Sequence, residues 1–346
     1  MINLILFILI LGSIVLVHES GHFLFAKLTG VQVFEFSIGM GPAIFTRKGK
    51  DGTSYSLRAI PIGGYVSLAG EDPEVDLTKN KGKNLQDKTV LQRFLVMSMG
   101  VGFNFIYAFL ILFFVGLIFG SATLKPVISN VTEGYPASMV GIEKGDKVLS
   151  INDRKVTFID DITLYLTVEN LKENVSIEVE KPTGRIEKYV VTPVKEKVNG
   201  EDTYRVGIEL SDTVEKGFSK AVIYSFKKAG AIFKQMFVVL GSLFTGKLSI
   251  NKLSGPVGIY SIVGQTKSQG IASLLYLVAL LSINVGVINI LPFPAFDGGR
   301  VLFLIIEKLK GSPVSPKVEN TIHSIGFILL ILLMIYITFN DIFRLF

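Results

Sequence analysis

Over residues 2–26 the chain reads INLILFILILGSIVLVHESGHFLFA, and this stretch decides the class of fold. It is long enough for a helix across a bilayer, because the roughly 30 Å hydrocarbon core needs about 20 helical residues. Its second half carries three titratable side chains within five residues, His18, Glu19 and His22. Such groups are costly to bury at membrane depth, so their presence predicts a functional role.

His18-Glu19-Ser20-Gly21-His22 has the H-E-x-x-H spacing of a metal site. On a helix this spacing places both imidazoles on one face, where they can share a metal ion. Zinc is the usual ion, and the intervening Glu can take a proton from zinc-bound water. Most chance matches are surface helices without metal, but in an apolar helix other partners would have to stabilise the buried polar groups. The motif therefore predicts Zn²⁺, with His18 and His22 as ligands and Glu19 as general base.

Composition indicates a membrane protein. Of the 346 residues, 49% are hydrophobic and 18% are charged, against roughly a quarter charged in soluble proteins. The net charge of +6 is not gathered in a basic tract with aromatic residues, so no nucleic-acid partner is expected, and lysine-rich loops would face anionic lipid. The absence of cysteine excludes thiolate ligands and a cysteine nucleophile. The first apolar run lacks a basic leader and a cleavage site, so we expect a retained span.

Four apolar segments are long enough to span the bilayer: about 2–25, 95–119, 271–290 and 322–339. Lysine and arginine gather between the first two segments and after the third, and the positive-inside rule places both loops in the cytoplasm. The N-terminus, the region between the second and third segments and the C-terminus then lie outside. This topology predicts that the histidines and the end of the third segment meet at the cytoplasmic side.

Residues 31–70 are not typical of a helix. Residues 31–38 and 55–60 alternate partly between apolar and polar positions, and Gly39-Met40-Gly41-Pro42 favours a turn. We expect strands that form a membrane-associated β-hairpin, tolerated at this depth only where protein or water covers the backbone. Residues 71–88 are polar and predict a solvated linker.

The third segment ends in a pattern that can supply another metal ligand. Pro292 and Pro294 end the helix, and Asp297 is followed by two glycines. A catalytic zinc site needs a third protein ligand and one open position. Asp297 is the predicted ligand, with a turn-capping role as the alternative. Glu35, the nearest carboxylate downstream of the histidines, lies in a strand-like stretch.

Three further stretches have less definite roles. Asn104, inside the second span, fits either a hydrogen bond to a neighbouring helix or a place near the site. Residues 214–250 combine apolar positions near helical spacing with several lysines, which favours an interfacial amphipathic helix. A fifth span is the alternative, disfavoured by Lys227, Lys228 and Lys234. Residues 254–259 are expected to form a turn before the third span.

Between residues 126 and 209 the sequence becomes charged and rich in predicted strands. The expected strands are Pro126–Val131, Lys147–Asn152, Val175–Glu180 and Lys188–Pro193. Within this region, residues 134–152 resemble the signature of bacterial PDZ domains: a hydrophobic-Gly-hydrophobic triplet, two spacers, Gly-Asp and a strand ending in Asn. Such domains bind a peptide, commonly a C-terminus, by adding a strand to a sheet edge. A β-domain that only restricts access is the alternative.

Taken together, these motifs resemble the bacterial site-2 protease family, the zinc intramembrane metalloproteases of RseP type, over essentially the whole chain. Two motifs carry most of the resemblance, the zinc helix and the pattern around Asp297. The chain departs from the family pattern in having one PDZ-like unit and in Phe296 and Arg300, where Leu and His are common. The matching stretches are His18–His22, Gly39–Pro42, Ile60–Val66, Asn104, Ser254–Ile259 and Asn289–Gly298.

The expected architecture is a polytopic α-helical membrane protein of about four transmembrane helices, with a β-hairpin element and an inserted extracytoplasmic PDZ-like α+β domain. Residues 1–120 form the first half of the protease core, 121–212 the PDZ-like domain, and 213–346 the interfacial helix and the second half. The resemblance implies a multi-pass protein of the bacterial inner (cell) membrane, with the active site near the cytoplasmic side.

The predicted activity is zinc-dependent hydrolysis of peptide bonds in or near the transmembrane segment of single-span membrane proteins. The resemblance implies anti-sigma factors or remnant signal peptides as substrates. Because a helical substrate must be unwound, we expect the β element to extend it, with contacts from Asn289, Asn284, Asn104, Gly39 and Gly41. The alternatives are a non-catalytic scaffold that recruits partners through its PDZ-like domain, and a membrane-anchored zincin that cuts soluble substrates.

Overall fold

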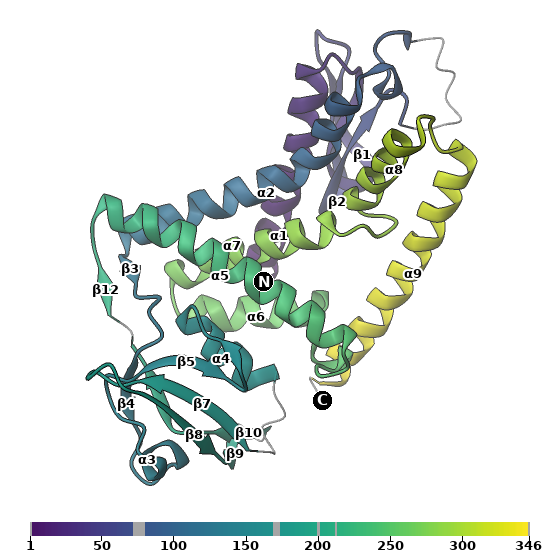
Figure 1. Cartoon of the computed structure of the whole chain (residues 1–346). Coiled ribbons are helices and arrows are strands. Elements are labelled where there is room, and N and C mark those ends of the chain that lie inside the picture. The colour runs from purple at the N-terminus through teal and green to yellow at the C-terminus, as the bar shows by residue number, and fades with distance from the viewer. Residues whose placement is uncertain (1, 72–79, 169–173, 199–200, 212, 345–346) are drawn as a thin grey trace. The chain divides into compact units, whose positions relative to one another are not determined.

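The computed structural model describes residues 2–71, 80–168, 174–198, 201–211 and 213–344 (Figure 1). Within these ranges four helices are long and apolar enough to cross a membrane, which confirms the four predicted segments. The third agrees with its predicted limits, and the others extend beyond them at one end or both. The four helices are α1 (Ile2–Leu28), α2 (Val90–Ile118), α7 (Ile271–Ile290) and α9 (Pro316–Phe343).

The chain forms two compact units, Met1–Ile111 with Leu253–Phe346, and Leu112–Lys252. In the first unit, apolar side chains of α1 pack with those of α6 (Pro256–Ser268) and α7. Helix α2 lies so close to α1 at Gly21 that a Cβ there would be 2.1 Å from the carbonyl oxygen of Met99. This close approach explains a glycine inside the metal-motif helix, where it weakens helix propensity.

The predicted β element is confirmed as β1 (Val33–Lys48) paired with β2 (Ser54–Leu68). Its register is more elaborate than a simple hairpin, because residues 35–38 pair on one side with 64–67 and on the other with 54–57. Residues 43–48 pair in turn with 54–58. Glycines at positive φ let the strands fold back: Gly39 (84°), Gly41 (84°) and Gly63 (85°).

One expectation about the connecting regions is wrong. Residues 254–259 were expected to form a turn, but α6 begins at Pro256, which needs no N–H donor at this position. The N–H groups of Gly255 and Gly258 instead donate to the Asp341 carboxylate at 2.9 and 2.8 Å. The loop after α7 contains a further helix, α8 (Asp297–Lys310).

The predicted solvated linker is also partly wrong. Residues 72–79 lie outside the described residues, but Leu85 is buried in the short 3-10 helix η2 (Leu85–Asp87) and packs against apolar residues of α1 and β1. Asn84 beside it is 2% exposed. This end of the segment belongs to the protein interior.

In the second unit the four predicted strands are confirmed, with small shifts of their ends, by β4 (Ile128–Val131), β5 (Lys147–Ile151), β7 (Val175–Glu180) and β8 (Ile186–Val191). The main sheet has the order β6-β5-β7-β8, and β4 pairs with β11. The remaining elements around it are β3 (Ser121–Ala122), α3 (Pro136–Val140), β6 (Arg154–Lys155), α4 (Ile159–Val168), β9 (Val194–Val198), β10 (Glu201–Arg205), β11 (Ile208–Leu210) and β12 (Val214–Glu215).

The Gly-x-x-x-Gly-Asp stretch has a clear structural role in this unit. Gly141 ends α3 at φ 93°, and Gly145 turns the chain at the same φ. The buried carboxylate of Asp146 then accepts the N–H of Glu143 at 2.9 Å and the ammonium of Lys181 at 3.0 Å. The pattern therefore fixes the connection between α3 and β5.

Helix α5 (Phe218–Phe244) lies within the segment expected to be amphipathic, and it belongs to this second unit. Lys228 pairs with Asp160 at 2.6 Å and Lys234 with Asp161 at 2.7 Å, both on α4. The helix is not among the four candidate spans of the described residues. It is followed by the short 3-10 helix η3 (Ile250–Lys252).

Candidate metal centre

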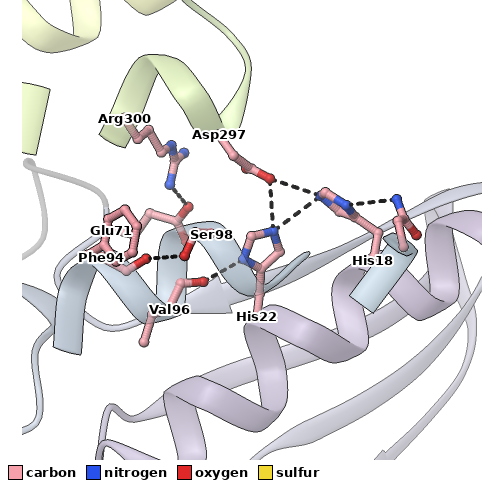
Figure 2. A network of polar contacts seen from close by, with 9 residues as sticks. His18, His22, Glu71, Phe94, Val96, Ser98, Asp297 and Arg300 are labelled. Atoms are coloured by element: carbon pink, nitrogen blue, oxygen red, sulfur yellow. Dashed lines mark hydrogen bonds and ion pairs between the residues drawn. The ribbon is translucent and has the colours of Figure 1, made fainter. Parts of the chain in front are cut away.

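The structure brings His18, His22 and Asp297 together from α1 and the first turn of α8 (Figure 2). Oδ2 of Asp297 lies 3.1 Å from Nε2 of His18 and 3.3 Å from Nε2 of His22. The two Nε2 atoms are 3.2 Å apart. Three potential ligand atoms thus form a nearly equilateral triangle from segments remote in sequence.

This triangle fits zinc. Tetrahedral coordination with ligand distances of 2.0–2.1 Å separates two ligand atoms by about 3.3 Å. Oδ2 of Asp297 is buried and has no hydrogen-bond partner among the described residues, although two imidazole nitrogens lie beside it. Burial raises the pKa of Asp297, but His18 and His22 outweigh burial and leave the pKa below its ordinary value. A carboxylate that binds zinc does so in its ionised form.

Outer contacts hold both imidazoles in the tautomer that a metal requires. Nδ1 of His22 is 2.7 Å from the carbonyl oxygen of Val96, which can only accept, so Nδ1 carries the proton and Nε2 is free. The Asn104 amide lies 3.3 Å from Nδ1 of His18 and is fully buried. The amide nitrogen Nδ2 is the atom placed beside Nδ1, while Oδ1 is buried without a hydrogen-bond partner among the described residues. A half-turn of the amide exchanges the two atoms, so that Oδ1 accepts the Nδ1 proton and Nε2 of His18 is free as well.

Glycines make room for this arrangement. A Cβ on Gly100 of α2 would lie 2.2 Å from Nε2 of His22. Non-bonded heavy atoms rest about 3.5 Å apart, so this Cβ would clash with the ring. At the other ligand, a Cβ on Gly298 would lie 2.3 Å from the Ile290 carbonyl oxygen. Only residues without a Cβ therefore allow α2 to approach His22 and α8 to begin against the end of α7.

Glu19 shares a cavity of about 210 Å³ with the three ligand candidates. Tyr65 and Val66 of β2 line the same cavity, and a Cβ on Gly64 would lie 3.5 Å from Cγ of Glu19. A second cavity of about 790 Å³ shares wall residues with the first, among them Glu71 and Arg300, which are hydrogen-bonded to each other (Figure 2).

The model of Peptidase family M50 matches residues 6–333. The chain belongs to family M50, the site-2 protease family. RasP, a zinc metalloprotease of Bacillus licheniformis, is 32% identical over 421 aligned positions, with 99% of each chain covered. An Enterococcus faecalis protein named "Probable protease eep" is 33% identical over 424 positions, again with 99% of each covered.

Membership of M50 confirms the predicted class. The chain is a zinc metallopeptidase of the intramembrane site-2 type, and its cofactor is Zn²⁺. The alternative of a non-catalytic scaffold is thereby excluded. The four apolar helices and the M50 relatives together indicate a multi-pass membrane protein.

The residues predicted to contact substrate in this M50 protease are not gathered at one place. Asn104 is buried against His18, whereas Asn284 and Asn289 are half-buried on α7. Gly39 and Gly41 lie at the fold of β1. In the part of the chain that the structure describes, none of these five residues lines either of the two cavities.

Glu35, the alternative ligand, is engaged elsewhere. Its carboxylate accepts hydrogen bonds from Arg58 at 2.7 Å and from Tyr65 at 2.5 Å. Burial raises the pKa of Glu35, but these hydrogen bonds and one from Ser56 outweigh it and lower the pKa overall. Glu35 stabilises the β element.

Sequence reasoning missed the contacts of Gly100, Glu71 and Arg300. Gly100 could have been found as a small residue in an apolar helix, since such residues mark close helix contacts. The others had no local signal, because their partners are distant in sequence.

Proposed function

We propose that this M50 protease binds zinc through His18, His22 and Asp297 and cleaves single-span membrane proteins in or near their transmembrane segment. One observation carries the proposal: three ligand atoms 3.1–3.3 Å apart share a small cavity with Glu19, at the meeting of two apolar helices with α8. An ionised carboxylate and two oriented imidazoles at this spacing serve no packing purpose.

When bound, zinc polarises the scissile carbonyl and acidifies the attacking water. Glu19 accepts a proton from that water as its oxygen adds to the carbonyl carbon. Glu19 then passes the proton to the amide nitrogen as the carbon–nitrogen bond breaks, so a carboxylic acid and an amine leave. Val96 and Asn104 keep both imidazoles oriented throughout.

The β element provides a means of extending a helical substrate. Residues 64–68 pair with β1 on one side only, among the described strands, and Tyr65, Val66 and Leu68 line the cavity with Glu19. A strand edge beside the catalytic residue favours addition of substrate backbone as a further strand. Asn284, Asn289, Gly39 and Gly41 would contact the extended chain farther from the metal.

The second unit would select substrates. Its strand and turn arrangement around Gly141 and Asp146 supports a PDZ-like domain that binds a peptide or C-terminus outside the membrane. The basic residues of 27–93 and of the α7–α9 connection support a position of the metal site near the cytoplasmic face of the bacterial cell membrane. Suitable substrates are single-span proteins already shortened outside the membrane, such as anti-sigma factors, or remnant signal peptides.

The test is cleavage by the purified full chain of a single-span membrane protein in detergent, with the cut position read by mass spectrometry. Cleavage within or beside the apolar segment, abolished by a zinc chelator and by Glu19→Gln, is expected. Glu215→Gln, which alters an exposed carboxylate that pairs with Lys220 outside the cavity, should keep the activity. Full activity of Glu19→Gln would refute the mechanism, and cuts confined to soluble regions would favour a membrane-anchored zincin.

A further inference from the structure

Ala295, two residues before Asp297, has an unusual backbone conformation. Its φ is 78°, in the left-handed region that residues with a Cβ rarely adopt. Such a conformation persists only where the surroundings impose it. The loop that carries the proposed third zinc ligand is therefore held by something outside itself.

His323 on α9 is one restraint. The N–H of Ala295 donates to Nδ1 of His323 at 3.0 Å. Because a backbone N–H can only donate, Nδ1 must be unprotonated. Nε2 of the same ring is buried and has no hydrogen-bond partner among the described residues. The imidazole therefore directs its hydrogen-bonding capacity to the loop through Nδ1.

Gly326 on the same face of α9 is a second restraint. A Cβ there would lie 2.4 Å from Cβ of Pro294 and 2.8 Å from its carbonyl oxygen. Helix α9 thus contacts two consecutive loop residues, Pro294 by close packing and Ala295 by a hydrogen bond. The next residues, Phe296 and Asp297, begin α8.

We propose that His323 is a positioning residue for Asp297, through its hydrogen bond to the left-handed Ala295. This inference rests on the proposed zinc site. Without the acceptor at Nδ1, Ala295 relaxes toward negative φ and the start of α8 shifts away from His18 and His22. Zinc binding weakens as a consequence, because ligand distances must hold to within about 0.2 Å.

Two polar substitutions separate the hydrogen bond from packing. The amide oxygen of Asn in His323→Asn can occupy the place of Nδ1, whereas the longer side chain in His323→Gln carries its oxygen near the place of Nε2. Thr321→Val is the control on α9, because the Thr321 hydroxyl donates to the carbonyl oxygen of Lys317 within its own helix, at 2.8 Å. Ala295→Gly tests the conformation directly, because glycine adopts positive φ without strain.

The measurements are zinc affinity of the purified full chain, by competition with a chelator, and the visible spectrum of the cobalt-substituted protein. Loss of a contact that orients a ligand typically lowers metal affinity roughly 10- to 100-fold. We expect this loss for His323→Gln, near-normal affinity and spectrum for His323→Asn, and partial recovery when Ala295→Gly is combined with His323→Gln. Equal behaviour of His323→Asn and His323→Gln, whether both normal or both impaired, would overturn the proposal.

The Asp297→Ala variant separates a failure of the proposed zinc site from a failure of the proposed role of His323. If Asp297→Ala keeps its zinc, the proposed site itself is wrong. If Asp297→Ala loses zinc and His323→Gln binds it normally, only the role of His323 is wrong.

Discussion

Gly100→Ala should disable the metal centre without removing a ligand. The added methyl would lie 2.2 Å from Nε2 of His22, and 2.7 and 2.8 Å from two ring carbons. The nearest atoms belong to an imidazole that Val96 and the packing of α1 already hold in place. The ring must therefore move, or α2 must move away from α1.

The size of this displacement can be worked out from the contact distance. Non-bonded heavy atoms rest about 3.5 Å apart, so the ring or helix must give way by roughly 1.3 Å. Zinc ligands tolerate about 0.2 Å, and a misplacement of about 1 Å in an active site can lower the rate roughly 100-fold. Alanine favours a helix over glycine by about 1 kcal/mol, so α2 itself is not weakened.

Zinc content and cleavage rate of the purified Gly100→Ala chain test this reasoning. Gly102→Ala is a matched control on the same helix, because its methyl would meet the end of the flexible Met99 side chain, Sδ at 2.8 Å and Cε at 4.0 Å. We expect Gly100→Ala to lose its zinc and to cleave at least 100-fold more slowly. Gly102→Ala should keep its zinc and its cleavage rate. Normal zinc content and rate in Gly100→Ala would show that His22 does not occupy this position.

Three further outcomes follow from the contacts around the site. Asn104→Ala should lower zinc affinity roughly 10- to 100-fold, measured by chelator competition, because the tautomer of His18 is no longer fixed. Asp341→Ala should lower the free energy of unfolding by about 1–3 kcal/mol, measured by denaturant titration, because the N–H groups at the start of α6 lose their acceptor. The pKa of Glu35 is lower in the folded protein than in the unfolded chain, where it is about 4.3. The ionised Glu35 carboxylate therefore stabilises the fold fully above about pH 4.3, and this stabilisation is lost as the pH falls through the folded-state pKa. Glu35→Gln should therefore flatten the decline in melting temperature below about pH 4.3.

The sequence predicts those features that depend on local periodicity. The apolar runs predicted all four long helices, because a bilayer demands continuous apolar length. Alternation predicted β1, β2 and the strands of the second unit. The spacing of His18 and His22 placed two imidazoles on one helix face, and loop charge with the proline-glycine pattern pointed to Asp297.

Other features depend on contacts between distant segments and could not be predicted in this way. Helix α6 begins with two glycines and a proline, and its capping acceptor, Asp341, lies more than eighty residues later. Helix α8 follows directly after two prolines that end α7, so its start looked like a loop. His323 has no motif around it, and only the structure places its ring beside Ala295.

The most direct test of the proposed centre is the zinc content of the purified Asp297→Ala chain beside that of Glu19→Gln, measured by elemental mass spectrometry. If His18, His22 and Asp297 hold the metal and Glu19 only moves protons, Glu19→Gln keeps about one zinc per chain and Asp297→Ala falls well below it. Zinc retained in Asp297→Ala, or lost in Glu19→Gln, would contradict this assignment of ligands and base.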